Sequence, residues 1–297
     1  MKALASLRHA GRPSLISSLI SGLISGLSPG RIPAPILAMV LVAGIFLFAP
    51  FLPSLGDPNA IDLSQRLQPP GLNHWLGADP LGRDILVRLI HGGRVTLALA
   101  LAAVVVGGGF GVLVGLIAGY FGGVWDRLLM RLTDMQMALP TLLLALLILA
   151  AAGPGVGNLV LILALTGWTR FARIVRGQVL SLRTRDFILS AQAIGATPMR
   201  IMFRHLLPNL VSPLVVVATL ELARVILIEA ALSYLGLGVQ PPTASWGRML
   251  AEGEVYVSTA WWVVTFPGLA IIAAVLAINL GGDALRDRLD PKRRHSA

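Results

Sequence analysis

Cysteine is absent from this 297-residue chain, and charged residues make up only 13% of it. A soluble domain carries about 25% charged residues. Without cysteine the chain has no disulfide, no thiolate nucleophile and no cysteine-based metal centre. Hydrophobic residues make up 56% of the sequence, so the composition indicates an integral membrane protein.

Lysine occurs at only two positions, Lys2 and Lys292. A phosphate-binding Walker A loop needs a lysine directly after its glycines, and neither lysine has that setting. Any ATP hydrolysis must therefore take place on another polypeptide. The sequence also has no evident pairing of nucleophile with base and no set of metal ligands, so a membrane enzyme is the least favoured class.

The net charge of +10 could suggest nucleic acid as a partner. The basic residues, however, cluster between apolar segments and are not interleaved with the aromatics that stack on bases. Arginines on one side of a bilayer explain the charge better. We therefore predict contact with membrane lipid and none with nucleic acid.

Six stretches are apolar enough to cross a bilayer, which takes about 20 residues. They are residues 36–52, 95–120, 132–152, 155–171, 210–235 and 260–280. Most basic residues lie before the first stretch, around 127–131, within 170–208 and after the last. This bias predicts that the N-terminus and the C-terminus are both cytoplasmic. The fold class expected is an all-α integral membrane protein with six transmembrane helices.

The chain divides into four expected parts. They are an amphipathic cytoplasmic or interfacial segment (1–35), a first transmembrane helix with an extracytoplasmic loop (36–94), a transmembrane core (95–282) with a cytoplasmic loop at 176–208, and a basic cytoplasmic tail (283–297). Within the core, glycine recurs at every fourth position, and this spacing predicts a seam where another helix approaches closely. The seam glycines are Gly107, Gly111, Gly115, Gly119 and Gly123.

The loop before the fifth span contains the stretch SAQAIGATPMRIMFRHLLP, which starts at Ser190. Thr197 followed by Pro198 is a helix-start signal, and Gly195 suits the end of a preceding helix. We expect two short helices with a tight bend between them and a second bend at Pro208. The helices are expected over 185–194 and 198–206.

Small residues at this bend would let another protein approach closely. Met199 and Met202 supply adaptable apolar contact, and Arg200 and Arg204 supply charge. These features favour a docking surface, with an ordinary interfacial loop as the alternative.

The same stretch resembles the cytoplasmic "EAA" loop of the membrane subunits of ATP-binding-cassette (ABC) importers. That pattern runs Glu-Ala-Ala, three residues, Gly, nine residues, Ile, one residue, Leu-Pro. Leu189, Ser190 and His205 depart from it. The resemblance implies an ATPase-coupling surface formed by Ala191, Gly195, Ala196, Thr197, Met199, Arg200, Arg204, Leu207 and Pro208.

Two further stretches narrow the family. HWLGADPLGRDILVRLIHGGRVTL, from His74, and EAALSYLGLGVQPPTASWG, from Glu229, resemble the C-type subunit of dipeptide, oligopeptide and nickel permeases. The resemblance covers about residues 35–291. It implies a type I importer permease (MetI-like) fold in the bacterial cytoplasmic (inner) membrane, forming half of an alternating-access pathway.

The family resemblance also implies the partners. They are a homologous B-type permease subunit, two ABC ATPases that bind ATP and Mg, and a periplasmic or surface-anchored substrate-binding protein. No cofactor is expected in this chain itself. Which solute is carried, whether a peptide, nickel or a related small molecule, stays open.

Three charged residues lie within the fifth span: Glu221, Arg224 and Glu229. Charges at this depth are costly and are expected to face protein or water. Glu221 and Arg224 are three residues apart and can pair on one helix face, or all three can line a pathway. A rival function is an ion-coupled secondary transporter that uses these three residues. It would require broken spans in corresponding inverted repeats, and no such pairing is evident.

Asp79, Arg83 and Asp84 lie among turn-forming residues before the second span. Two aspartates without further ligands make a poor metal site, and no metal is expected. Together with Trp246, these residues are expected in an ordered extracytoplasmic loop that contacts a partner.

Overall fold

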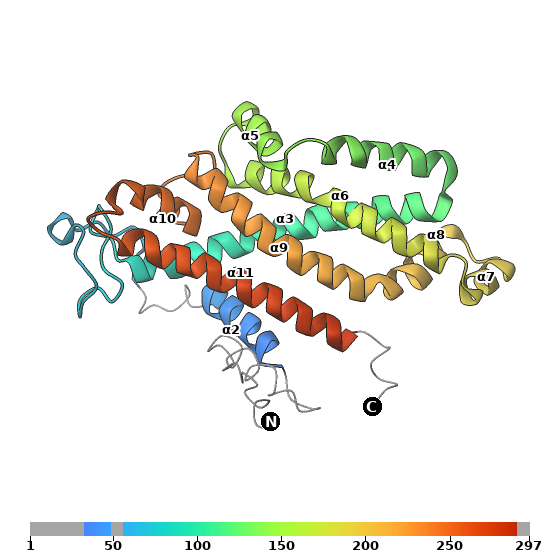
Figure 1. The fold of residues 1–297 in the computed structure, drawn as a ribbon, viewed down its shortest axis with the longest axis horizontal. Helices are drawn as coiled ribbons and strands as arrows, with labels where there is room; N and C mark the ends of the chain where they lie inside the picture. The colour runs from blue at the N-terminus through green and yellow to red at the C-terminus, as the bar shows by residue number, and fades with distance from the viewer. Residues whose placement is uncertain (1–32, 49–55, 290–297) are drawn as a thin grey trace, which may run out of the picture.

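The computed structural model describes residues 33–48 and 56–289, which form an elongated bundle of helices (Figure 1). The expected segment 1–35 lies almost wholly outside this part of the chain, and so does the second half of the expected tail, from residue 290 on. The longer helices are α2 (Ala34–Phe48), α3 (Ile85–Phe121), α4 (Gly123–Met137), α5 (Thr141–Ala152), α6 (Val156–Leu182), α9 (Val211–Tyr234) and α11 (Trp262–Leu289). The shorter ones are α7 (Asp186–Ala193), α8 (Pro198–Arg200) and α10 (Trp246–Gly253). Within the described residues, β-pairing is limited to one bridge between Ala78 and Asp84.

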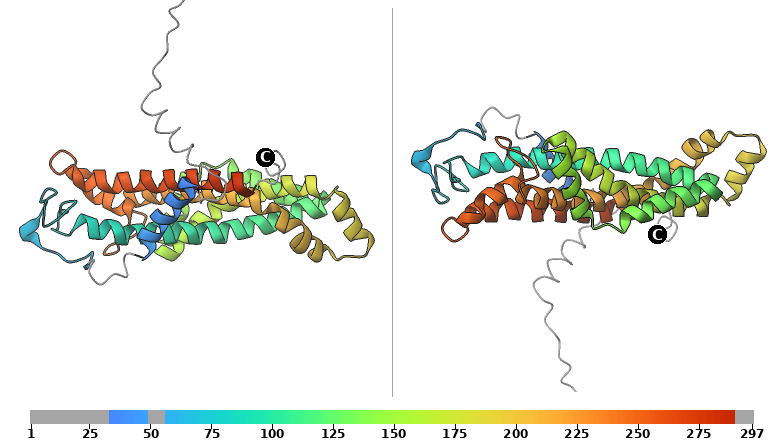
Figure 2. Two further views of the ribbon diagram at one scale, coloured as in Figure 1. Left: turned by 90° about the horizontal axis from the view of Figure 1, so that it is seen from below. Right: turned by 90° about the horizontal axis from the view of Figure 1, so that it is seen from above.

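The membrane-crossing helices run along the long axis of the bundle (Figure 1). Four are long and apolar enough to span a bilayer: α3, α6, α11 and the continuous stretch Pro198–Tyr234. The predicted all-α membrane fold is confirmed, with α2 as a shorter apolar helix. The two ends of the bundle are built from different elements. Residues 56–84 and α10 form one end, and α7 projects from the other (Figures 1 and 2).

The third predicted span, 132–152, is wrong as a single helix. α4 ends at Met137, α5 begins at Thr141, and the two helices meet at 88°. Pro140 lies at the break. Proline has no N–H to donate and disfavours a helical residue before it, which explains why the helix stops there.

The second span begins well before residue 95, at Ile85. The Asp84 side chain accepts a hydrogen bond from the Val87 backbone N–H at 3.0 Å and caps this helix. The last span also runs beyond its prediction, through the basic residues Arg286 and Arg288 to Leu289. The start of α3 and the end of α11 were both predicted from apolar character alone. Both helices extend past their apolar stretch into residues that include charged ones.

The glycine seam on α3 packs against α6 of the same chain. A Cβ added at Gly107 would lie 2.5 Å from the Ala164 carbonyl oxygen, and one at Gly115 would lie 2.6 Å from that of Ala172. Gly111 and Gly119 meet α6 in the same way. Gly123 does not belong to the seam, because it opens α4 with φ +55° and open space around it. The seam is therefore used inside the chain, and no bare glycine face is left on it for a second subunit.

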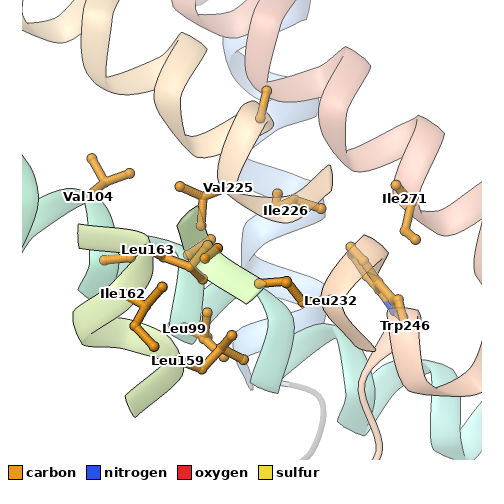
Figure 3. Packing of buried hydrophobic residues seen from close by; sticks show 14 of the residues in the cluster. Leu99, Val104, Leu159, Ile162, Leu163, Val225, Ile226, Leu232, Trp246 and Ile271 are labelled. Atoms are coloured by element: carbon orange, nitrogen blue, oxygen red, sulfur yellow. The ribbon is translucent and has the colours of Figure 1, made fainter. Parts of the chain in front are cut away.

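The two largest apolar clusters among the described residues join the helices of the bundle. The larger joins α3, α6, α9 and α11 and includes Leu99, Leu163, Ile226 and Trp246 (Figure 3). The smaller ties the loop after α6 to the ends of α3 and α6. Its buried members are Leu116, Val175, Val179, Ile188, Ile201, Met202, Leu206 and Leu210. The loop is thus a packed part of the fold rather than a free connector.

Candidate coupling surface and buried charge sites

The predicted bend in the loop lies at Gly195. α7 ends at Ala193, and Gly195 has φ +79°, a left-handed conformation that glycine adopts without strain. The Thr197 hydroxyl then accepts a hydrogen bond from the Arg200 backbone N–H at 3.4 Å, with Pro198 as the first helical residue. Threonine and proline therefore take the helix-start positions expected of them.

The second predicted bend, at Pro208, is absent as a helix end. The backbone stays helical from Pro198 to Tyr234. It passes through a π-helical segment, η4 (Ile201–Leu206), and a 3-10 turn, η5 (Leu207–Leu210). Pro208 lies at the start of the 3-10 turn, where its missing N–H is tolerated.

The two most exposed large apolar side chains of the loop lie at its bend. Ile194 is 86% exposed and Met199 is 62% exposed. Met202, expected on the same surface, is instead buried at 3% in the smaller apolar cluster. Ile194 was missed by sequence reasoning, which weighted the small and basic residues. Its signal was available: it is a large aliphatic residue directly before the Gly195 bend.

A shallow cavity of about 330 Å³ lies on the inner side of this bend. It is lined by Ala191, Ile194, Gly195, Ala196, Arg200, Arg204 and His205. Most of the expected coupling residues are thus brought together on one surface. Leu207 lies half-buried against the smaller cluster, and Pro208 is exposed.

Within the span, Glu221 is 2% exposed and contacts two arginines. Arg224 donates to Glu221 Oε1 from Nη2 at 2.7 Å and from Nε at 2.9 Å. Arg170 of α6 places Nη1 3.5 Å from the other oxygen, Oε2. Gly167 makes room for the carboxylate, because a Cβ there would lie 2.8 Å from Oε1. Arg170 was not among the expected site residues, since it lies on a different helix.

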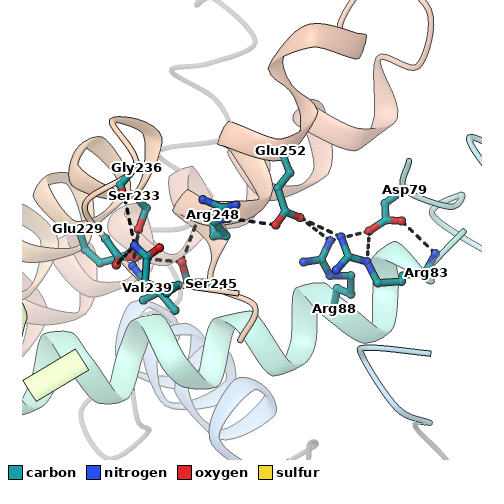
Figure 4. A network of polar contacts seen from close by, with 12 residues as sticks. Asp79, Arg83, Arg88, Glu229, Ser233, Gly236, Val239, Ser245, Arg248 and Glu252 are labelled. Atoms are coloured by element: carbon teal, nitrogen blue, oxygen red, sulfur yellow. Dashed lines mark hydrogen bonds and ion pairs between the residues drawn. The ribbon is translucent and has the colours of Figure 1, made fainter. Parts of the chain in front are cut away.

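Glu229 does not join that group. Its Oε1 accepts hydrogen bonds from the Ser233 hydroxyl at 2.7 Å and the Ser245 hydroxyl at 3.0 Å (Figure 4). Ser233 in turn accepts one from the Val239 backbone N–H at 3.2 Å. Glu229 therefore ties the end of α9 to the start of α10, apart from Glu221 and Arg224.

A second buried charge cluster lies at the α10 end of the bundle (Figure 4). Asp79 Oδ2 lies 2.6 Å from Arg83 Nε and 2.6 Å from Arg88 Nη1. Glu252 Oε2 lies 3.0 Å from Arg83 and 2.9 Å from Arg88, while its Oε1 accepts from Arg248 at 3.0 Å. The cluster fastens the loop before α3 to α10.

Burial disfavours the charged form of Glu252, but the positive charges of Arg88 and Arg83 and the hydrogen bonds from Arg88 and Arg248 outweigh it. The pKa of Glu252 therefore lies below its ordinary value. Arg88 and Glu252 were missed by sequence reasoning: Arg88 lies within the stretch from His74 that resembles the family, but its partner Glu252 is 164 residues away in the sequence.

The outer residues expected to contact a partner are mostly interior. Asp79 is 1% exposed, Arg83 8% and Trp246 0%. Trp246 donates its indole N–H to the Leu89 carbonyl at 2.9 Å. Asp84 caps α3 and lies 2.8 Å from His74. These side chains shape the α10 end of the bundle but offer a partner little surface. Within the described residues, no group of three His, Asp or Glu side chains is placed to hold a metal ion.

The fold is that of an ABC importer permease. Among solved structures, the inward-facing methionine transporter MetNI has a chain that matches with a TM-score of 0.58, over 69% of this chain and 98% of that one, at 22% identity. Residues 111–295 match the family of binding-protein-dependent transport system inner membrane components, and the chain belongs to this family.

Curated relatives place the chain within that family. It is 45% identical to the di/tripeptide transport permease DppC of Pseudomonas aeruginosa, over 88% of each chain. It is 44% identical to the glutathione transport permease GsiD of Escherichia coli, over 86% of this chain and 84% of that one. It is 41% identical to the dipeptide transport permease DppC of Alkalihalophilus pseudofirmus, over 87% and 86%.

The chain is therefore a C-type permease subunit of an ABC importer, a multi-pass protein of the inner membrane. It works with ATPase and binding-protein partners, and ATP hydrolysis takes place on the ATPases. Nothing in these relationships supports the ion-coupled secondary transporter.

Proposed function

We propose that this subunit forms half of a translocation pathway for short peptides. The observation that carries the substrate class is the set of relatives above, which are 41–45% identical over most of the chain and are named for dipeptides, tripeptides and glutathione. All of these solutes are short peptides. The other half of the pathway would be a homologous B-type permease subunit.

One of the two ABC ATPases would dock on the bend at Gly195. Ile194 and Met199 support this assignment, because large apolar side chains this exposed in an aqueous loop suit burial by a partner. Arg200 and Arg204 beside them supply charge for the same contact. Since the smaller apolar cluster packs the loop against α3 and α6, closure of the ATPases would move the loop and these helices together. The pathway would then alternate between inward-facing and outward-facing states, with a periplasmic or surface-anchored binding protein delivering the peptide.

The α7 end of the bundle would be cytoplasmic and the α10 end extracytoplasmic. The distribution of arginine supports this orientation, because the stretch 170–208 and the two ends of the sequence hold most of the basic residues. Both termini would then be cytoplasmic.

Reconstitution tests the proposal. The subunit is purified with its B-type partner and ATPases, placed in liposomes, and supplied with binding protein and a radiolabelled dipeptide. We expect uptake that requires ATP and stops when the ATPases are inactivated. Uptake of another solute but no peptide would contradict the substrate class. Peptide uptake driven by an ion gradient alone would contradict the ATP-driven mechanism.

A further inference from the structure

An open cavity of about 300 Å³ lies between α4, α6 and α9, halfway along the bundle. Its lining is mixed: Ile174, Val217 and Leu220 are apolar, and Arg170, Arg173 and Glu221 are charged. Arg170 also lines a smaller neighbouring cavity of about 110 Å³. A ligand that fits the larger cavity has an apolar body and one charged end.

The charges around this cavity leave one positive charge in excess. Arg224 pairs with Glu221, and Arg173 pairs with Asp134 at 2.5 Å. To the described residues, the Arg170 guanidinium makes one ion pair of 3.5 Å with Glu221 and no hydrogen bond. Glu221 Oε2 is buried and likewise has no hydrogen-bond partner among them. This pair is therefore poorly satisfied, and 46% of the Arg170 side chain is exposed.

The depth of Arg170 decides what it faces. It lies where the uncharged part of α6 (156–169) ends, opposite Glu221 of α9. A half-exposed arginine at this depth is costly against lipid and faces water or protein instead. The open side of the cavity therefore faces water or the second subunit rather than lipid, and the proposed half-pathway places it on the route of the solute.

We infer that Arg170 binds the C-terminal carboxylate of a peptide in transit, with the peptide's apolar part against Val217 and Leu220. A planar guanidinium with unused N–H donors matches a carboxylate, which it can bind through two parallel hydrogen bonds. Arg224 does not have this role, because it is committed to Glu221 and to the Thr166 carbonyl. The inference rests on the proposed function in peptide transport.

A thiol reporter in the cavity tests the site. Because this chain has no cysteine, Leu220→Cys gives it a single reactive thiol, at a side chain 54% exposed. The complete complex, without nucleotide or binding protein, is treated with a maleimide, and modification of this chain is followed by mass spectrometry. Omitting the binding protein removes its own selection among ligands. Leu161→Cys, at a position on α6 that is 62% exposed and outside the cavity, is the matched control.

We expect the dipeptide alanyl-leucine to slow modification at residue 220 about threefold or more and to leave the control unchanged. Its C-terminal amide is expected to need about tenfold higher concentration, the effect of losing one charge-assisted contact. Arg170→Gln removes this difference, and Arg170→Lys, which keeps the charge, retains part of it. Acetate, which has the carboxylate without the apolar body, gives no protection at the same concentration.

Equal protection by the amide, equal protection by acetate, or an unchanged preference in Arg170→Gln would overturn the inference. Import of alanyl-leucine by the unsubstituted complex is measured in parallel. Normal import without protection contradicts only the Arg170 site, whereas absence of import contradicts the proposed function itself.

Discussion

Arg88, in the first turn of α3, donates to Asp79 over 2.6 Å, and only 2% of each side chain is exposed. Asp79 belongs to the loop before the helix, so this contact fixes that loop on the end of a membrane-crossing helix. Arg83 contacts the same carboxylate oxygen, which makes Asp79 the shared partner of two buried arginines.

We expect Asp79→Ala to destabilise the protein by about 3–5 kcal/mol, the range for removing one partner of a buried ion pair. The two arginines would keep Glu252 but lose their nearer carboxylate. Thermal unfolding of the purified complex in detergent measures the effect. Asp57→Ala, at an exposed position of the same loop, serves as the control, and equal losses in both variants would refute a special role for Asp79.

Glu252 makes the stability of the outer end depend on pH. Its pKa in the folded protein is lower than the ordinary 4.5, so the folded state favours the carboxylate. The stabilisation is present in full above the ordinary pKa and is lost as the pH falls through the lowered value. We expect hydrogen exchange in α10, compared with α6 in the same sample, to accelerate selectively in this acidic range. In Glu252→Gln the residue no longer titrates, so α10 exchanges faster already at pH 7 and the acid-dependent increase is smaller. An acid response that is the same in this variant would assign the effect to another group.

The seam between α3 and α6 predicts a contrast between neighbouring glycines. Gly115→Ala places a methyl group 2.6 Å from the Ala172 carbonyl oxygen and forces the two helices apart, whereas a methyl group added at Gly109 would meet no heavy atom within 4 Å. We expect Gly115→Ala to lower the free energy of unfolding by about 1–3 kcal/mol and Gly109→Ala to leave it unchanged. Folded yield and thermal unfolding report both. A neutral Gly115→Ala would mean that the two backbones can separate at little cost.

Glu221 holds Arg224 and Arg170, so its removal leaves two arginines without their carboxylate. Removal of Arg224 leaves Glu221 still paired with Arg170. We therefore expect Glu221→Ala to reduce folded yield in membranes more than Arg224→Ala does. The loss of folded yield in the double variant is expected to be smaller than the sum of the losses in the two single variants. Additive losses would show that the pair is not coupled.

The coupling surface predicts a defect confined to ATPase binding. Ile194→Asp puts a charge on an 86% exposed side chain, which leaves the fold intact but prevents apolar burial by a partner. We expect normal membrane insertion with loss of ATPase co-purification. Leu72→Asp, at a 97% exposed side chain in the loop before α3, is the control. Retained ATPase in Ile194→Asp would place the docking surface elsewhere. This variant is a cleaner test than a bulky residue at Gly195, where the left-handed backbone alone would cause strain.

Much of the fold could be predicted from the sequence because membrane helices are dominated by one local property, apolar length. Apolar length predicted the wrong helix boundaries where a proline or a helix cap determined them. Pro140 breaks the predicted span 132–152, and the Asp84 cap starts α3 ahead of Arg88 and His91, which apolar length alone assigned to a loop. Conversely, the proline at 208 was expected to break a helix, but π and 3-10 turns absorb it.

The site was predictable only where its residues are neighbours in the sequence. The bend at Gly195 and the spacing of Glu221 and Arg224 follow from local patterns. Arg170 reaches Glu221, and Glu252 reaches Arg88, only because different helices pack together, and a single sequence does not show which helices are neighbours. Met199 and Met202, three residues apart on a helix, have similar chemistry, and only packing against α3 and α6 distinguishes the buried one.

The glycine seam has a mechanical consequence. At Gly107, Gly111 and Gly115 the backbone of α3 lies directly against carbonyl oxygens of α6, and at Gly119 it lies against the Val179 side chain, so the two helices behave as one rigid unit. α3 begins beside the contact between Asp79 and Arg88. The C-terminal halves of α3 and α6 pack against the loop that carries the bend at Gly195. If an ATPase docks at that bend, as proposed above, its motion would be carried along both helices together, and the relative sliding that opens and closes a route is expected at the other helix interfaces.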